Sequence, residues 1–174
     1  MSFRRPRGRP GPRPDPDSPE ARDPQGARLL ALRLLAGRDF APGELKSRLE
    51  ARGFGDAAVA SVLGELTASG ALNESRFASN YVTWHAARGH GPVRIAADLR
   101  RLGIPETLIA AALGAGPDWA ALARRICQGK FGAQAPEGWP EKARRMRFLQ
   151  YRGFSADHIR AATGADPDTD QDLE

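Results

Sequence analysis

One short pattern occurs three times in the chain, at intervals of fifty residues. Each copy has a leucine, a glycine four residues later, an apolar residue directly after the glycine, and a branched aliphatic residue five positions further on. The three copies are Leu49-Gly53-Phe54-Val59, Leu99-Gly103-Ile104-Ile109 and Leu149-Gly153-Phe154-Ile159. Self-similarity at a fixed period indicates tandem structural units. The chain is therefore expected to fold as an array of similar modules.

Each copy predicts the end of one helix and the start of another. Glycine adopts the left-handed conformation that ends a helix, and the apolar residue after it packs back on the last turn. A second helix is expected to begin near Asp56, Pro105 or Ser155, which suit an N-cap or the first helical position. Apolar residues at helical spacing predict a further helix ahead of each copy, at 28–36, 74–87 and 119–128. Each unit therefore has three helices.

The composition supports an all-α fold. The chain contains 30 Ala and 17 Leu but only 4 Val and 5 Ile, and β-branched residues are the ones that favour strands. The three-helix repeats are expected at 25–72, 73–116 and 117–163. A unit of this size has little core of its own, so we expect the repeats to pack end to end in an elongated, curved array.

The two ends differ in composition from the centre. Residues 1–24 hold half of the 14 prolines and six arginines, and we expect a disordered Pro/Arg-rich arm. Residues 164–174 carry five acidic and no basic residues, which predicts a disordered acidic tail. Between them, residues 25–163 have 20 basic and 12 acidic residues, a net charge of +8 against +5 for the whole chain. The basic character therefore belongs to the folded part.

Several classes of protein are excluded by what the chain lacks. No apolar run approaches the ~20 residues of a membrane span, and the N-terminus has no signal-peptide core, so we expect a cytoplasmic protein with no membrane partner. The one cysteine, Cys127, excludes an intramolecular disulfide and is expected in the core. The segment Gly129-Lys130-Phe131 lacks the rest of a phosphate-binding loop, and the three histidines fit no zinc motif: His85, His90 and His158. We expect no enzyme activity, cofactor or metal.

The second repeat carries the most specific motif. It reads Leu72-Asn73-Glu74-Ser75-Arg76-Phe77-Ala78 with Tyr81, and then Arg88-Gly89-His90-Gly91-Pro92-Val93-Arg94-Ile95. The third repeat adds Arg147-Phe148-Leu149 and Arg152-Gly153-Phe154-Ser155. Over residues 27–163 the chain resembles the RecX family, the bacterial regulators of the RecA recombinase. One departure is His85, which stands where relatives often carry arginine.

The resemblance implies a fold of three tandem three-helix repeats, and it implies a function. Such a protein binds RecA and RecA–DNA filaments in the helical groove of the filament. It lowers ATP hydrolysis, strand exchange and co-protease activity, and so acts in recombination, DNA repair and the SOS response. The expected partners are RecA and DNA, the DNA being single-stranded within the filament and weakly bound alone, and we expect a monomer.

Basic residues are concentrated toward the third repeat. Residues 119–160 contain nine basic and three acidic side chains. Guanidinium groups form paired hydrogen bonds with phosphates and with carboxylates, so this surface suits either DNA or an acidic protein. A module that binds DNA on its own, without sequence preference, therefore stays open as an alternative function. The residues expected to face RecA or DNA are Arg76, Arg88, Arg94, Arg124, Arg125, Lys130, Lys142, Arg144, Arg145, Arg147 and Arg152.

The Gly89-His90-Gly91 segment and the aromatic residues have simpler structural interpretations. The two glycines predict a tight turn between helices. An anion-binding loop is the alternative, because a helix beginning at Pro92 would direct its first amides toward this segment. The aromatic residues at helical spacing are expected in the core, where they are unavailable for base stacking: Phe77, Tyr81, Phe131, Phe148 and Phe154.

Overall fold

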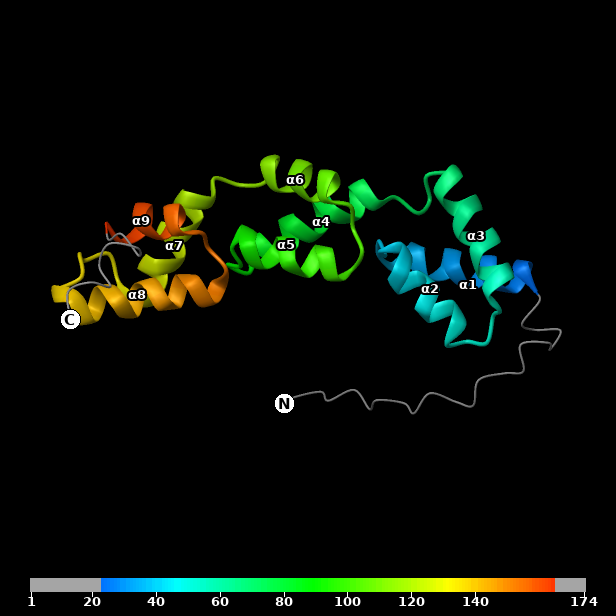
Figure 1. Ribbon diagram of the computed structural model, residues 1–174, viewed down its shortest axis with the longest axis horizontal. Helices are drawn as coiled ribbons and strands as arrows, with labels where there is room; N and C mark the ends of the chain where they lie inside the picture. Colours follow the sequence, from blue (N-terminus) through cyan, green and yellow to red (C-terminus); the bar gives the residue numbers. More distant parts are fainter. Residues whose placement is uncertain (1–22, 165–174) are drawn as a thin grey trace. The chain divides into compact units, whose positions relative to one another are not determined.

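The computed structural model describes residues 23–164, and within this range the chain forms nine helices and no strand (Figure 1). The prediction of an all-α fold is therefore confirmed for the described residues. The helices are α1 Pro24–Gly37, α2 Pro42–Glu50, α3 Asp56–Ala68, α4 Glu74–Ala87, α5 Pro92–Arg101, α6 Glu106–Gly114, α7 Trp119–Phe131, α8 Gly138–Arg152 and α9 Ala156–Thr163. None of them is both long and apolar enough to cross a bilayer.

The chain divides into two compact units, residues 1–74 and 75–174. The first contains the repeat α1–α3, and the second contains the repeats α4–α6 and α7–α9, with Glu74 at the boundary. The expected arm and acidic tail lie outside the described residues, apart from their inner ends. There, α1 already begins at Pro24, with Asp23 accepting a hydrogen bond from the Gln25 amide as its N-cap, and Gly164 caps α9.

The fifty-residue pattern marks the same helix ending in all three repeats. The glycines have φ values of 97°, 79° and 84° at Gly53, Gly103 and Gly153. After each glycine, the amide of the apolar residue donates to the carbonyl of the leucine five residues earlier, at 3.3, 3.1 and 3.1 Å. These bonds run from Phe54 to Leu49, from Ile104 to Leu99 and from Phe154 to Leu149. Such a closure satisfies carbonyls that the helix end leaves without partners, so the predicted role of these residues is confirmed.

The linker inside the third repeat is shorter than the sequence indicated. We expected α7 to end at residue 128, but it continues to Phe131 and ends at Gly132, which has a φ of 87°. The next helix begins at Gly138, where the Glu141 carboxylate accepts a hydrogen bond from the Glu137 amide at 2.8 Å. The pKa of Glu141 is lowered by this bond and by its hydrogen bond to Arg145.

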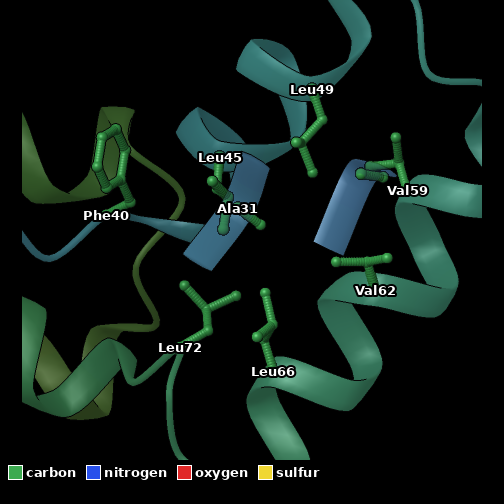
Figure 2. Packing of buried hydrophobic residues seen from close by; sticks show 9 residues of the cluster. Ala31, Phe40, Leu45, Leu49, Val59, Val62, Leu66 and Leu72 are labelled. Atoms are coloured by element: carbon green, nitrogen blue, oxygen red, sulfur yellow. The ribbon is translucent and has the colours of Figure 1, made fainter. Parts of the chain in front are cut away.

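The first unit has a compact apolar core between its three helices (Figure 2). Val59, Val62 and Leu66 on α3 face Ala31 of α1, with Leu45 and Leu49 of α2 beside them. Phe40, in the link between α1 and α2, is also buried, and the Arg38 guanidinium lies 3.7 Å from its ring centre.

The second unit buries one apolar face of each of its helices. In the second repeat the buried set is Phe77, Ala78, Val82 and Ala86 on α4, Ile95, Ala96 and Leu99 on α5, and Ile109 and Ala112 on α6. The third repeat packs around Leu122, Ala123, Cys127, Met146, Leu149, Phe154 and Ile159. Cys127 lies in the core as expected, and burial raises the pKa of its thiol. This leaves the thiol protonated and unreactive at neutral pH.

Candidate functional site

The second and third repeats are joined by backbone hydrogen bonds at one turn. The turn between α4 and α5 lies against the C-terminal end of α8. The Gly91 amide donates to the Arg152 carbonyl at 2.8 Å, and the Val93 amide donates to the Gly153 carbonyl at 3.0 Å. The Arg152 guanidinium donates in return to the Arg88 carbonyl at 3.1 Å. The positive end of one helix thus meets the negative end of another, which is a favourable arrangement of their dipoles.

These bonds occupy the amides of the turn itself, which an anion-binding loop would need to have free. Gly89 and His90 donate their amides to the carbonyls of Ala86 and His85, at 2.9 and 3.1 Å. The next two available amides, at positions 91 and 93, are those bonded to α8, and Pro92 has none. No amide of residues 89–93 is therefore left for an anion. The prediction that Gly89 and Gly91 form a tight turn between helices is confirmed.

Three of the predicted site residues meet around this turn. Arg88 follows α4, Arg94 lies in the first turn of α5, and Arg152 ends α8. The pKa of His90, in the centre of the turn, is lowered first by burial and then by the positive charges of Arg94, Arg152 and Arg88. The fold therefore gathers arginines from two repeats into one positively charged surface, which we call the junction cluster: Arg88, Arg94 and Arg152.

An aromatic group that we had not predicted as a site lies beside the junction cluster. The Trp84 side chain is 53% exposed, and the Arg88 guanidinium lies 3.1 Å from its ring centre. His85 packs edge-on against Trp84, with 4.7 Å between the ring centres, and stacks on Tyr81, with 4.1 Å between the ring centres. His85 and His90 share a hydrogen bond between their Nδ1 atoms at 2.8 Å. The sequence does carry a signal for this group, because helical spacing places four of its residues on one side of α4 and its C-terminal end: Tyr81, Trp84, His85 and Arg88.

A second exposed group lies on α8. Arg144, Arg147 and Tyr151 occur at i, i+3 and i+7, so they follow one side of the helix. All three are exposed, Tyr151 at 81%. The buried residues of α8 lie on the opposite side. Arg144 and Arg147 therefore present their charges to solvent, together with one aromatic ring.

For Arg145 the structure corrects the expectation of a partner-facing residue. Its side chain is buried at 6% exposure. Its guanidinium donates to the Glu141 carboxylate at 2.5 Å and to the Gln134 carbonyl at 2.8 Å. A buried guanidinium that is bonded to a carboxylate and a carbonyl stabilises the start of α8 and the linker before it. We therefore remove Arg145 from the candidate surface.

The other cations differ in how far acidic neighbours neutralise them. In the first repeat and on α5, basic side chains form ion pairs: Arg28–Glu65, Arg38–Glu44, Arg48–Glu44, Lys46–Glu50, Arg100–Glu106 and Arg101–Asp98. Within residues 23–164, no carboxylate lies at salt-bridge distance from Arg88, Arg94, Arg124, Arg125, Lys130, Lys142, Arg144, Arg147 or Arg152. Arg76 is exposed on α4. Among the predicted site residues, the unneutralised charge thus lies on α7, α8 and the junction cluster, while Arg33 and Arg52 in the first repeat are exposed cations without an ion pair to the described residues.

Metal-binding groups are not brought together in the same way within residues 23–164. In the part of the chain that the structure describes, no three His, Cys, Asp or Glu side chains are grouped closely enough to hold a metal ion. His158 caps α9 with Ser155, since each side chain bonds to the other residue's backbone amide. Its pKa is lowered by burial.

Comparison with known protein families agrees with the repeat architecture. Three family models match in order along the chain: the first three-helix domain of RecX at residues 27–66, the second at 73–113 and the third at 118–163. The chain belongs to the RecX family. The resemblance found in the second-repeat motif is thereby confirmed, and so is the fold of three tandem three-helix repeats.

Individual RecX proteins match most of the chain. The Regulatory protein RecX of Halorhodospira halophila is 42% identical over 148 residues, which cover 84% of this chain and 92% of the relative. That of Stenotrophomonas maltophilia is 37% identical over 139 residues, covering 79% and 85%. A crystal structure of RecX from Lactobacillus salivarius superposes with a TM-score of 0.71 at 18% identity, over 80% of this chain and 93% of that one. At this identity the structural match supports the RecX fold only.

Proposed function

We propose that this RecX-family chain is a cytoplasmic regulator that binds RecA and RecA–DNA filaments and lowers their activity. The affected activities are ATP hydrolysis, strand exchange and co-protease function, and hence recombination, DNA repair and the SOS response. The observation that carries the proposal is the match of all three repeats, in order, to the RecX family. The chain acts by binding and not by catalysis.

The unneutralised cations support binding to a filament that contains DNA. Two groups of arginines, the junction cluster and the exposed Arg144–Arg147 pair, lie in the second unit, and the junction cluster includes residues of both its repeats. Phosphate contacts of this kind strengthen binding without reading sequence. We propose that contacts to RecA set the position of a single chain in the filament groove, and that these arginines then contact the single-stranded DNA phosphates or acidic side chains of RecA.

The test measures RecA ATP hydrolysis on single-stranded DNA as this protein is added. The wild-type chain should inhibit near stoichiometric concentration. Reversing two charges on α8, Arg144→Glu with Arg147→Glu, should raise the concentration needed by roughly tenfold or more, since contacts are lost and repulsion is added. The matched control reverses two exposed arginines of the first repeat, Arg33→Glu with Arg52→Glu.

Two results would contradict the proposal. If the wild-type chain leaves ATP hydrolysis and strand exchange unchanged, the regulatory function is wrong. If both double variants inhibit equally well, the α8 surface has no special part in binding. A thermal unfolding curve for each variant separates loss of binding from loss of folding.

An autonomous DNA-binding module is the second candidate, favoured by the same unneutralised charge. It predicts tight binding to naked DNA, with affinity that falls steeply as salt is raised. We expect the naked-DNA affinity to be weak and indifferent to sequence. Two results together would favour this second candidate. The chain would have no effect on RecA in the absence of DNA, and the charge variants would lose RecA inhibition in step with their affinity for naked DNA.

A further inference from the structure

We propose that Trp84 and the Arg88 guanidinium stacked on it form a platform for an unpaired base of single-stranded nucleic acid. Arg94 and Arg152 would hold the phosphates on either side of that base. This assigns a direct contact to the bases themselves, in addition to the phosphates. It concerns the chain alone and requires no RecA, so it stands or falls separately from the regulatory function.

Trp84 is placed on the outside of its repeat. The buried residues of α4 include Phe77, Val82 and Ala86, whereas Trp84 is 53% exposed. Large aromatic side chains contribute most to folding when they are buried, so a half-exposed indole contributes less to the stability of this repeat than a buried one would. Among the described residues, its aromatic and cation–π contacts are with the edge-on His85 ring and the Arg88 guanidinium. A planar ligand therefore has access to the indole or to the outer side of the guanidinium.

The platform is held in place before any ligand arrives. His85, which supports the edge of the indole, stacks on Tyr81 at 4.1 Å and is hydrogen-bonded to His90 at 2.8 Å. Arg88 lies on the indole at 3.1 Å from its centre, and its guanidinium also donates to the Trp84 carbonyl at 3.4 Å. Groups that are already ordered lose little conformational freedom when they bind.

The surrounding charge favours a polyanion. Arg88, Arg94 and Arg152 all act on His90, and no carboxylate of the described residues lies at salt-bridge distance from them. The Asp98 carboxylate also acts on the pKa of His90, but it already forms an ion pair with Arg101. The three cations around His90, of which Arg88 also lies on Trp84, are therefore available to phosphates.

The combination of a planar platform with unpaired cations indicates single strands. Proteins that bind single strands combine a positive surface with aromatic side chains on which bases stack, and arginine planes also stack on bases. In duplex DNA the bases are already stacked and cannot reach such a platform. The carboxylates of an acidic protein surface would satisfy the arginines but would not stack on the indole as a base does.

The experiment compares two fluorescent probes of equal length, an oligo(dT) and an oligonucleotide in which every nucleotide is abasic. Both carry the same phosphates, but only the first can stack. By fluorescence anisotropy, wild-type protein should prefer oligo(dT). Trp84→Leu should weaken oligo(dT) binding about 5- to 150-fold and leave the abasic affinity unchanged, while Trp84→Phe, which keeps a ring, should retain most of the binding.

Two control variants separate stacking from charge. Trp139→Leu removes another exposed tryptophan, which lies between Glu137 and Glu141 on the chain, and should change neither affinity. Arg94→Ala should weaken both probes alike and reduce the slope of log affinity against log salt by about one. Circular dichroism and thermal unfolding of each variant check that the fold is kept.

Each outcome decides the proposal. Equal binding of the two probes by the wild-type chain overturns it, and so does equal weakening of both probes in Trp84→Leu. If Trp84→Leu binds oligo(dT) normally but no longer inhibits RecA, Trp84 contacts protein, and the assignment to a base is wrong. Selective loss of oligo(dT) binding supports it, even if the wild-type chain leaves RecA unaffected.

Discussion

The turn that joins the second and third repeats leaves no room for a side chain at Gly91. A Cβ atom there would lie 2.5 Å from the Phe154 amide nitrogen and still closer to the Gly153 carbonyl. All of these are backbone atoms, so no rotamer change relieves the clash. The backbone of Gly91 has φ −83° and ψ 165°, which alanine adopts without strain. Gly91→Ala therefore tests the junction itself, not the backbone preference of glycine.

The expected loss of unfolding free energy in Gly91→Ala follows from the two hydrogen bonds that the substitution breaks. Moving the turn away from α8 breaks the bonds from Gly91 to Arg152 and from Val93 to Gly153. At about 1 kcal/mol each, their loss costs about 2 kcal/mol, and more if the buried groups stay unpaired. Alanine also reduces the entropy of the unfolded chain, which offsets about 0.4–1 kcal/mol. We expect a net loss of about 1–3 kcal/mol.

The assay is urea unfolding by circular dichroism, combined with hydrogen exchange at single amides. Gly91→Ala should lower the midpoint and remove protection from the amides at positions 91 and 93. The control, Gly129→Ala, lies in α7 of the same unit, where a Cβ meets nothing within 4 Å. It should stabilise the protein by about 0.5–1 kcal/mol. If Gly91→Ala unfolds like the wild type and keeps both amides protected, the junction described here is wrong.

Substitution of the buried and of an exposed arginine of α8 should have different effects. Arg145→Met should lower the free energy of unfolding, measured by urea titration, by about 1.5–3 kcal/mol. Arg147→Met should change the free energy of unfolding by no more than about 0.5 kcal/mol but should weaken RecA inhibition. Similar stability of the two variants would contradict the burial of Arg145. Burial lowers the pKa of His85 and of His90, so near pH 6.5 the folded chain binds fewer protons than the unfolded chain. Stability should therefore be highest above about pH 6.5 and fall as the pH drops below it, less steeply in a His85→Asn, His90→Asn variant; an unchanged slope in that variant would refute the reasoning.

Features set by neighbours in the chain could be predicted from the sequence. The glycine closures at Gly53, Gly103 and Gly153 depend on residues within one helical turn, so their spacing was sufficient. The bounds of α4 and the N-cap role of Asp118, whose side chain accepts from the Ala121 amide at 2.9 Å, are equally local. The family resemblance came from the same kind of contiguous motif.

Features that depend on packing between repeats could not be predicted in this way. The Gly91 amide bonds to a carbonyl about sixty residues away, and nothing in the local motif distinguishes that arrangement from an open anion-binding loop. The prediction that Arg145 faces a partner rests on its charge and not on its position on the helix. Its helical phase was informative, since Leu149, four residues later, lies on the buried side of α8.

The junction also constrains how the chain would bind a polyanion. Because the amides of residues 89–93 are already bonded, an anion at this turn would depend mainly on the side chains of the junction cluster. Binding through arginine side chains is sensitive to salt and indifferent to sequence, whereas a loop of amides would fit one phosphate geometry. Arg152 has two roles, since its guanidinium also donates to the Arg88 carbonyl. If a phosphate drew that guanidinium away, the two amide bonds to α8 would remain, so we expect that the cluster could bind a phosphate without separating the repeats.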